Sequence, residues 1–488
     1  MVIVQYPDQF MVNISNYIAG AFHKPASGEY LPVYDPSVGK VYAQAPDSTT
    51  HEVQSAYEAA AAAFPIWSGY STNKRSEILL RIADLIDANL EKLAQAESKD
   101  NGKPIELAKR VDIPRASANM RFFAQAITQF SSESHEMTDA INYTLRQAMG
   151  VVGTISPWNL PLYLFTWKIA PALAAGNTVI AKPSEVTPMS AFLFSEICIE
   201  AGLPPGVLNV IHGDGIKVGA EIVKHPQIKA ISFTGSTRVG EEIARVAAPM
   251  FKKISLEMGG KNPNIIFADC DYDRMLKTTV NSSFANQGQI CLCGSRILVE
   301  QRIYEKFKKD FVALTKTRKV GPPDKADSKV GAIVSKPHYE KILSYIELAQ
   351  EEGGTILTGG KAVFPVGYEE GWYIEPTIIE GLTYNCRTNQ EEIFGPVVTI
   401  MPFTTEEEAL KYADSTSYGL SCTIWTENLS RAHRVAKKID SGIVWVNTWL
   451  QRDLRTPFGG VKNSGVGREG GLEVLRFFTQ TKNVCIKY

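Results

Sequence analysis

The chain has 488 residues, more than one hydrophobic core usually serves, so two or three domains are expected. Hydrophobic residues make up 44% and the net charge is −1, which fits a soluble globular protein and argues against a nucleic-acid binder that relies on general attraction to phosphate. Seven scattered cysteines and seven scattered histidines, without a CxxC or HExxH motif, favour a reducing cytoplasm and no metal site.

The first half of the chain begins with helical patterns. No signal peptide is evident at the N-terminus, and the uncharged run 147–167 contains two prolines and an asparagine, so no membrane span is expected. Apolar residues recur at helical spacing over 51–99, and 101–104 (Asn-Gly-Lys-Pro) breaks this pattern. A further helix is expected from Arg110 to Ile127.

From about residue 150 short apolar runs alternate with helical segments. The predicted strands are Val151–Ile155, Thr178–Ala181, Val207–Ile211 and Ala230–Phe233, and the helices between them are Leu162–Ala175, Met189–Ala201, Lys217–Val223 and Arg238–Ala247. This alternation predicts parallel βαβ units, and such a sheet binds nucleotides at the carboxyl ends of its strands.

A second alternating region follows Glu257 and runs to about residue 458. Its predicted strands are Asn264–Phe267, Ser295–Val299, Val397–Phe403, Ser421–Trp425 and Gly442–Asn447, with helices that include Val334–Glu352 and Asn428–Ile439. Residues 142–147 and 482–488 alternate like exposed strands, whose free edges recruit partners. They predict an arm that builds a homo-oligomer.

These patterns predict an α/β chain with two open parallel-sheet domains and a small β arm. The predicted boundaries are residues 1–126 and 148–256 for a nucleotide-binding domain, 257–458 for a catalytic domain, and 127–147 with 473–488 for the arm.

Cys291 and Glu257 are the residues with the clearest chemical potential. Cys291 ends the segment FANQGQIC, whose polar and glycine residues allow a loop to expose the sulfur, although a lone cysteine is usually a small buried hydrophobe. Glu257 stands at the end of a short strand, before Gly259 and Gly260. A thiol nucleophile and a carboxylate base can divide aldehyde oxidation into two covalent steps.

Six motifs in order resemble the NAD(P)-dependent aldehyde dehydrogenase family over about residues 20–485: PWN, FTGS, LEMGGK, FANQGQIC, EEIFGP and PFGG. The resemblance implies the aldehyde dehydrogenase-like fold. It also implies that Cys291 is the nucleophile and that Glu257 activates the hydrolytic water. Asn159 would hold the oxyanion together with the backbone N–H of Cys291, and Cys293 would be a neighbour only.

The same resemblance implies an NAD site. Lys182 and Glu185 would hold the adenosine ribose, and a carboxylate there repels a 2′-phosphate, which favours NAD over NADP. Glu392 would bind the nicotinamide ribose and Phe394 would line the nicotinamide end. Further expected cofactor contacts are Ile155, Ser156, Pro157, Trp158, Ser184, Gly215, Phe233, Gly235 and Ser236.

Lys168 and Glu469 match positions proposed in the family for proton escape. A simple salt bridge between them explains the pair equally well.

Three arginines indicate that the substrate carries a carboxylate. Arg115, Arg452 and Arg455 suit a carboxylate, although Asp112 and Asp453 could instead neutralise them in salt bridges. The segments around these arginines are similar to the 2-aminomuconate and 2-hydroxymuconate semialdehyde dehydrogenases of the family. That similarity implies that arginines at 115 and 452 bind the substrate carboxylate. Three other residues are expected to line the substrate site: Trp167, Leu292 and Phe458.

The hypothesis is a cytoplasmic homodimer or homotetramer that oxidises such a semialdehyde to the dicarboxylate, in aromatic catabolism, through a thiohemiacetal and a thioester. Two alternatives remain. The enzyme class could serve an aliphatic or betaine-type aldehyde, or the chain could be a catalytically silent structural protein on the same fold. No nucleic-acid or membrane partner is expected.

Overall fold

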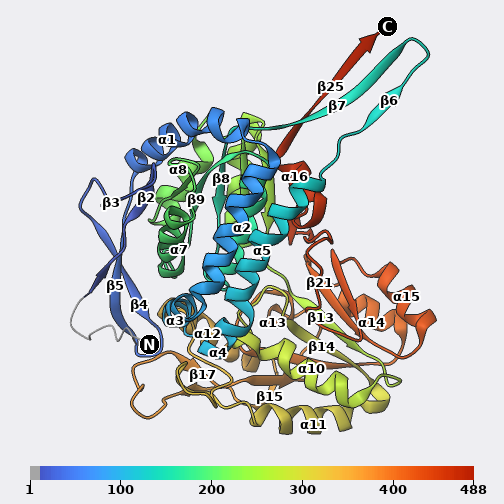
Figure 1. The fold of residues 1–488 in the computed structure, drawn as a ribbon. Coiled ribbons are helices and arrows are strands. Elements are labelled where there is room, and N and C mark those ends of the chain that lie inside the picture. Colours follow the sequence, from blue (N-terminus) through green and yellow to red (C-terminus); the bar gives the residue numbers. More distant parts are fainter. Residues whose placement is uncertain (1–10) are drawn as a thin grey trace.

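The computed structural model describes residues 11–488 (Figure 1). Residues 1–10, on which the expectation of no signal peptide rests, lie outside the described residues. Among residues 11–488, no helix combines the length and the low charge that a membrane crossing needs. In the same part of the chain, no group of three or more His, Cys, Asp or Glu residues is placed to hold a metal ion.

The first body is built on an eight-stranded sheet in the order β24-β12-β11-β8-β9-β10-β2-β3. The strands are β2 (Asn16–Ile18), β3 (Ala21–His23), β8 (Val151–Ile155), β9 (Thr178–Lys182), β10 (Leu208–Val210), β11 (Ala230–Thr234), β12 (Lys253–Glu257) and β24 (Gly465–Val466). β8 to β12 run parallel, whereas β24 pairs antiparallel with β12 at one edge, and the antiparallel pair of β2 and β3 forms the other edge. All four strands predicted between residues 150 and 235 are confirmed.

Helices cover this sheet because its central strands are mostly apolar and are buried on both faces. The helices are α1 (Thr50–Gly69), α2 (Thr72–Ala88), α3 (Leu90–Asn101), α4 (Ile105–Leu107), α5 (Ile113–Ala126), α6 (Pro161–Ala174), α7 (Met189–Glu200), α8 (Ala220–Lys224) and α9 (Thr237–Ala247). α6 packs against β8 and β9, and α5 lies between α2 and α6. Every residue of α6 is buried.

The second body is a seven-stranded sheet in the order β15-β18-β19-β14-β13-β21-β22 (Figure 1). The strands are β13 (Asn262–Ile266), β14 (Gly294–Glu300), β15 (Thr355–Thr358), β18 (Thr377–Glu380), β19 (Val397–Phe403), β21 (Ser421–Trp425) and β22 (Ile443–Val446). The flanking helices are α10 (Tyr272–Phe284), α11 (Tyr304–Lys316), α12 (Lys336–Glu351), α13 (Arg387–Gln390), α14 (Glu406–Ala413) and α15 (Leu429–Lys438). The sheet is parallel except for its edge strand β15.

A narrow sheet projects from the molecule at the upper right of Figure 1. It consists of β6 (Ser134–Glu136), β7 (Ala140–Ala148) and β25 (Thr479–Lys487), and β25 follows the short helix α16 (Gly471–Phe477). β7 and β25 pair antiparallel along their whole length, and most of β25 is exposed. The exposed strands predicted at 142–147 and 482–488 are therefore confirmed, as partners of each other.

Several smaller elements had no counterpart among the predicted ones. They are the sheet of β1 (Val12–Asn13), β4 (Tyr30–Asp35) and β5 (Lys40–Pro46), the pair β16 (Ala362–Val363) and β17 (Tyr373–Ile374), and the pair β20 (Tyr418–Gly419) and β23 (Val461–Lys462). Two predicted helices also begin differently, since π-helical turns occupy Ala108–Asp112 before α5 and Gly215–Gly219 before α8.

Candidate active site

The loop before Cys291 holds an unusual backbone conformation. Asn286, Gln287 and Gly288 have φ values of 51°, 58° and 69° in succession. A Cβ at Gly288 would lie 2.1 Å from the carbonyl oxygen of Gly395, so only glycine fits. The loop is tied to its surroundings by Gln287 Nε2, which donates to the carbonyl of Ala332 at 3.0 Å. This fixed turn presents the half-buried Cys291 at its end.

Asn159 reaches the same loop from the end of β8. Its Nδ2 donates to the carbonyl of Gln289 at 3.0 Å, two residues before Cys291. An amide nitrogen carries two hydrogens, and no contact among the described residues uses the second one. The structure therefore brings Asn159 beside the nucleophile loop with one donor to spare.

Glu257 ends β12, and both of its carboxylate oxygens are buried without a hydrogen-bond partner in residues 11–488. Burial, and then the negative charge of Glu469, raise the pKa of Glu257 well above its usual value, while Lys168, Arg468 and Arg452 oppose the rise. A Cβ at Gly459, in the PFGG motif, would lie 2.7 Å from Glu257 Oε1. The carboxylate of Glu257 is thus buried in a space that a side chain at position 459 would fill.

The environment of Cys291 favours the neutral thiol. Burial raises the pKa of Cys291, the carboxylates of Glu392 and Glu257 add to the rise, and Arg452 opposes it. A thiol in this state needs a base to become a nucleophile.

Lys168 and Glu469 form a buried ion pair, with 2.6 Å between Nζ and Oε1. Ser232 bridges them, since Lys168 Nζ donates to Ser232 Oγ at 3.1 Å and Ser232 Oγ donates to Glu469 at 3.0 Å. The salt bridge between them is present, and the proton-escape role stays a prediction.

The expected cofactor residues gather at the carboxyl ends of the parallel strands β8, β9 and β11. Lys182 ends β9 and pairs with Glu185 at 2.8 Å. Ser236 caps α9, because its Oγ accepts from the backbone N–H of Val239 at 3.4 Å. A Cβ at Gly235 would lie 2.4 Å from the ring of Phe233, so a larger residue here would have to displace that ring. Ile155 lies at the end of β8, with Ser156, Pro157 and Trp158 directly after it; Ser184 lies in the turn after β9, and Gly215 opens the π-turn before α8.

Glu392 and Phe394, between α13 and β19, contact the segments that follow β12 and β8. Glu392 Oε1 accepts from the backbone N–H of Gly260 at 2.8 Å, and a Cβ at Gly259 would lie 2.2 Å from Glu392 Oε2. The glycine pair after Glu257 thus makes room for a second carboxylate. Phe394 has φ 62° and meets Trp158 edge-on at 5.3 Å between ring centroids.

Arg115 and Arg452 converge on one aromatic group. Arg115 lies over the rings of Tyr163 and Trp167, at 5.3 and 5.7 Å, and Arg452 lies over Trp167 and Phe458, at 5.2 and 3.9 Å. Arg452 also donates to the hydroxyl of Tyr163 at 2.9 Å. Within residues 11–488, Arg115 Nε and Nη2 and Trp167 Nε1 are buried without a hydrogen-bond partner. Burial lowers the pKa of Arg115, and the charge of Arg452 adds to that.

Asp112 and Asp453 form no salt bridge with Arg115 or Arg452, so the salt-bridge alternative is wrong for these two arginines, but it is confirmed for Arg455. Asp112 pairs with Lys103 at 2.8 Å, and Asp453 pairs with Arg455 at 2.6 Å. Among the described residues, no carboxylate forms an ion pair with Arg115 or Arg452. The side chain of Arg455 is 80% exposed and held by Asp453, so the structure does not bring it into this group.

Sequence reasoning missed several residues of the site. Tyr163 joins both arginines, and Trp449 Nε1 donates to the carbonyl of Leu292 at 2.9 Å. His338 Nε2 lies 2.7 Å from the carbonyl oxygen of Phe394. A tyrosine in a buried helix and a histidine on a polar one carry no sequence signal that separates them from ordinary core and surface residues.

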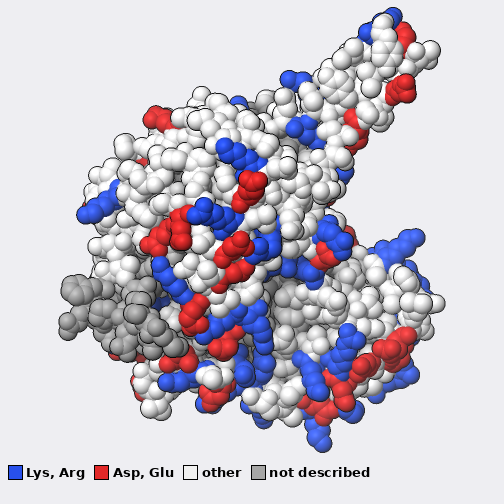
Figure 2. Space-filling model, in the orientation of Figure 1, with Lys and Arg blue, Asp and Glu red and all other residues white. Residues whose placement is uncertain are grey.

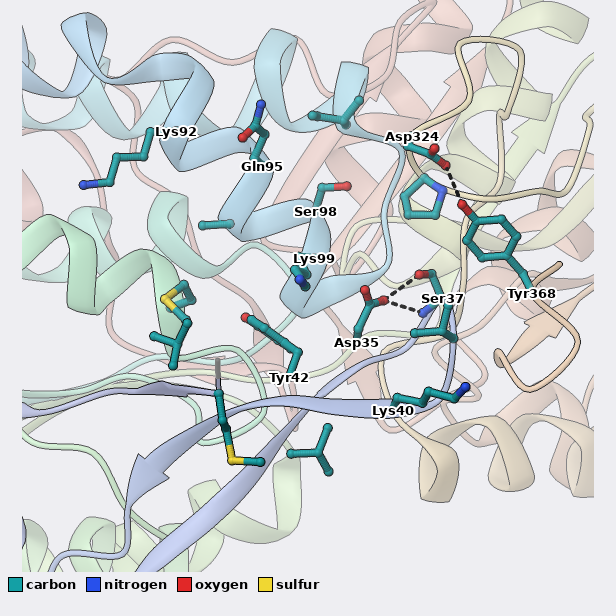
Figure 3. Close-up of a pocket in the computed structure, with 18 residues that line it drawn as sticks. Asp35, Ser37, Lys40, Tyr42, Lys92, Gln95, Ser98, Lys99, Asp324 and Tyr368 are labelled. Atoms are coloured by element: carbon teal, nitrogen blue, oxygen red, sulfur yellow. Dashed lines mark hydrogen bonds between the residues drawn. The ribbon is translucent and has the colours of Figure 1, made fainter. Parts of the chain in front are cut away.

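A separate cavity does not contain the residues predicted for the active site. A cavity of about 840 Å³ lies between α3, β5 and the loop residues Asp324 and Tyr368 (Figure 3), and no residue expected in the active site lines it. On the face drawn in Figure 2, acidic and basic side chains of the described residues are interspersed.

Comparisons with known proteins agree with this geometry. A family model described as "Aldehyde dehydrogenase family" matches residues 22–484. A 2-aminomuconic semialdehyde dehydrogenase of Bos taurus is 50% identical over 483 residues, covering 98% of this chain and 99% of that protein. A 2-hydroxymuconic semialdehyde dehydrogenase of a Pseudomonas species is 47% identical over 485 residues, covering 98% and 100%.

Solved structures share the fold. An aldehyde dehydrogenase of Bacillus cereus in complex with NAD+ has a TM-score of 0.95 at 37% identity, covering 97% of this chain and 96% of that one. A betaine aldehyde dehydrogenase of Staphylococcus aureus with NAD+ has a TM-score of 0.95 at 35% identity, covering 98% of both chains.

Proposed function

Because the chain belongs to the aldehyde dehydrogenase family, we propose that it uses NAD to oxidise 2-aminomuconate or 2-hydroxymuconate 6-semialdehyde to the dicarboxylate, in the catabolism of aromatic compounds. The carrying observation is the pair Arg115 and Arg452, whose guanidinium groups share one aromatic pocket and have no carboxylate partner among the described residues. Nε and Nη2 of Arg115 are buried without a hydrogen-bond partner among the described residues, which is costly, so a ligand anion is the natural complement.

The first half of the reaction forms the thioester. Glu257 takes the proton of Cys291, and the resulting thiolate adds to the aldehyde carbon. Asn159 Nδ2 and the backbone N–H of Cys291 donate to the oxyanion of the thiohemiacetal, where fixed donors stabilise the developing charge. Bound NAD supplies the acceptor for the hydride that leaves this carbon.

The second half releases the acid. Glu257 removes a proton from a water molecule that attacks the thioester, and Cys291 leaves as the thiolate. The raised pKa of Glu257 makes its carboxylate a stronger base than an exposed one. The buried pair of Lys168 and Glu469 lies behind Glu257 and is proposed to carry the released proton away.

We propose that the dinucleotide binds at the carboxyl ends of β8, β9 and β11. The N-terminus of α9 offers free N–H groups and a positive dipole end to a pyrophosphate, and Gly235 allows the close approach. Lys182 and Glu185, which pair with each other, are proposed to contact the adenosine ribose hydroxyls, and Glu392 is proposed to contact the second ribose. The carboxylate of Glu185 supports NAD rather than NADP.

The projecting sheet supports a homodimer or homotetramer, because β25 exposes a long strand edge that a second copy can cover. A cytoplasmic location is proposed from the seven free cysteines.

A spectrophotometric screen tests the proposal. Freshly generated ring-cleavage semialdehydes, an uncharged aliphatic aldehyde and betaine aldehyde are each assayed with NAD and with NADP. The proposal expects the highest kcat/KM for a muconate semialdehyde with NAD. Equal activity on uncharged or betaine-type aldehydes would favour the broader alternative. No reduction of NAD with any aldehyde would indicate a silent protein.

A further inference from the structure

A fully buried charge cluster of Glu97, Lys103 and Asp112 lies behind the loop that carries Asn159. Lys103 Nζ is 2.8 Å from Asp112 Oδ2 and 3.7 Å from Glu97 Oε1, and all three side chains are 0% exposed. The proposed reaction uses none of them. Burying three charges is expensive, and the attraction between them often only offsets that cost, so stability alone gives a weak reason for the cluster.

Lys103 makes a further contact that points to a role. Its Nζ donates to the backbone carbonyl of Asn159 at 3.1 Å. Asn286 Nδ2 donates to the same oxygen at 3.0 Å, and Asn101 Nδ2 donates to the neighbouring carbonyl of Trp158 at 3.0 Å. The backbone carbonyls on both sides of the Asn159 Cα atom, those of Trp158 and Asn159, therefore accept hydrogen bonds from side chains. The donors to the carbonyl of Asn159 include the charged amine of Lys103.

Glu97 holds the chain on the other side of Asn159. Its Oε2 accepts from the backbone N–H of Leu162 at 3.1 Å, in the first turn of α6, where no local side chain caps the helix. Burial raises the pKa values of Glu97 and Asp112, and the charge of Lys103 opposes both rises. The cluster acts as a clamp on the segment from Trp158 to Leu162.

We propose that Lys103, held in place by Asp112 and Glu97, is a positioning residue that aims the amide of Asn159 at the oxyanion. One hydrogen of this amide is already committed to the carbonyl of Gln289, so the direction of the other depends on where the backbone of Asn159 is fixed. Small displacements of a catalytic group are costly, since an error of about 1 Å can lower the rate roughly 100-fold. The same ion pair keeps Asp112 from Arg115, three residues further along.

The inference rests on the proposed oxyanion role of Asn159. A double-mutant cycle tests the positioning role of Lys103 separately from the oxyanion role of Asn159. The variants are Lys103→Met with Asp112→Asn, Asn159→Ala, and all three substitutions together. They are assayed with saturating NAD and whichever aldehyde the wild type oxidises. The variant with Lys103→Met and Asp112→Asn, called the clamp variant, is expected to lose roughly 10- to 100-fold in kcat. Its KM for NAD should stay within about 2-fold of wild type. In the Asn159→Ala background the same two substitutions are expected to cost less than about 3-fold, because the group that they aim is gone.

Equal losses in the two backgrounds, or an unchanged kcat in the folded clamp variant, would overturn the inference. An unchanged kcat in Asn159→Ala alone would instead overturn the oxyanion role. If the clamp variant does not fold, Asp112→Asn alone is used in the same cycle, with a smaller expected loss of about 3- to 10-fold. Lys109→Met, which changes a lysine near the surface of the same segment, is the control and should leave kcat unchanged.

Discussion

Replacing Arg115 by methionine is expected to lower kcat/KM for a carboxylated semialdehyde and to spare an uncharged aldehyde of similar length. Methionine keeps an apolar chain against the rings of Tyr163 and Trp167 and removes only the charge and the donors. Arg115 suits this test better than Arg452 does, because Arg452 also opposes the raised pKa values of Cys291 and Glu257. The loss of Arg452 would therefore weaken the chemical step for every aldehyde.

The expected loss of kcat/KM follows from the burial of the Arg115 guanidinium. Arg115 Nε and Nη2 are buried and unpaired in the free protein, so a substrate carboxylate that reaches them forms a charge-assisted bond away from water. Removing one partner of a buried, hydrogen-bonded charge pair costs about 2–5 kcal/mol, which is roughly 30- to 5,000-fold in kcat/KM. For the uncharged aldehyde we expect a change below about 3-fold, since Arg115 acts on neither the thiol nor the base.

The assay follows NADH absorbance for both aldehydes in wild type, Arg115→Met and Arg455→Met. Arg455 serves as the matched control, because its exposed side chain is already paired with Asp453. The control should match wild type on both substrates. If Arg115→Met lowered kcat/KM equally for both aldehydes, the role of Arg115 would be structural. If it lowered kcat/KM for neither, the substrate carboxylate would bind elsewhere.

Three further predictions concern the base, the cofactor and the buried ion pair. Because the pKa of Glu257 is raised, the wild-type rate should increase as pH rises through that pKa. Glu257→Gln should remove this increase and should lower both the burst and the steady-state formation of NADH, seen by stopped flow, because the same carboxylate activates the thiol and the water. Glu185→Ser should improve kcat/KM for NADP relative to NAD by roughly 10-fold or more, since a carboxylate no longer faces the 2′-phosphate. Glu469→Gln should lower Tm, since breaking a buried pair costs about 3–5 kcal/mol, and should move the pH profile to lower pH, because the charge of Glu469 raises the pKa of Glu257.

The order of strands and helices was predictable because helices cover both faces of a parallel sheet, which leaves a recognisable sequence pattern. Strands such as Val151–Ile155 and Thr178–Lys182 are buried on both faces, so they read as short continuous apolar runs between helical patterns. The strands between residues 12 and 46 left no such signal. They are short or half-exposed, and the edge strand Gly465–Val466 has only two residues. Their pairing depends on contacts with distant segments, which no local pattern encodes.

The chemical residues were predictable to a different extent. Cys291, Glu257 and Asn159 stand in motifs, and the structure brings Asn159 to the loop of Cys291 through a contact with Gln289. The partner of Asp112 was not predictable. Asp112 precedes Arg115 by three positions, a spacing that suggests an ion pair on one helix face. A π-helical turn ends at Asp112, and Lys103 captures its carboxylate from another segment.

Helix α6 carries two aromatic residues that contact the arginines. Tyr163 and Trp167 are four residues apart, a spacing that places their side chains on one helix face, and Asn159 lies two residues ahead of the helix. Arg115 lies over the ring of Tyr163, and Arg452 lies over the ring of Trp167. Lys168, the next residue, turns to Ser232 and Glu469 instead. Because every residue of α6 is buried, this helix cannot shift without disturbing the core. Tyr163 and Trp167, which contact Arg115 and Arg452, are therefore held in fixed positions by the core.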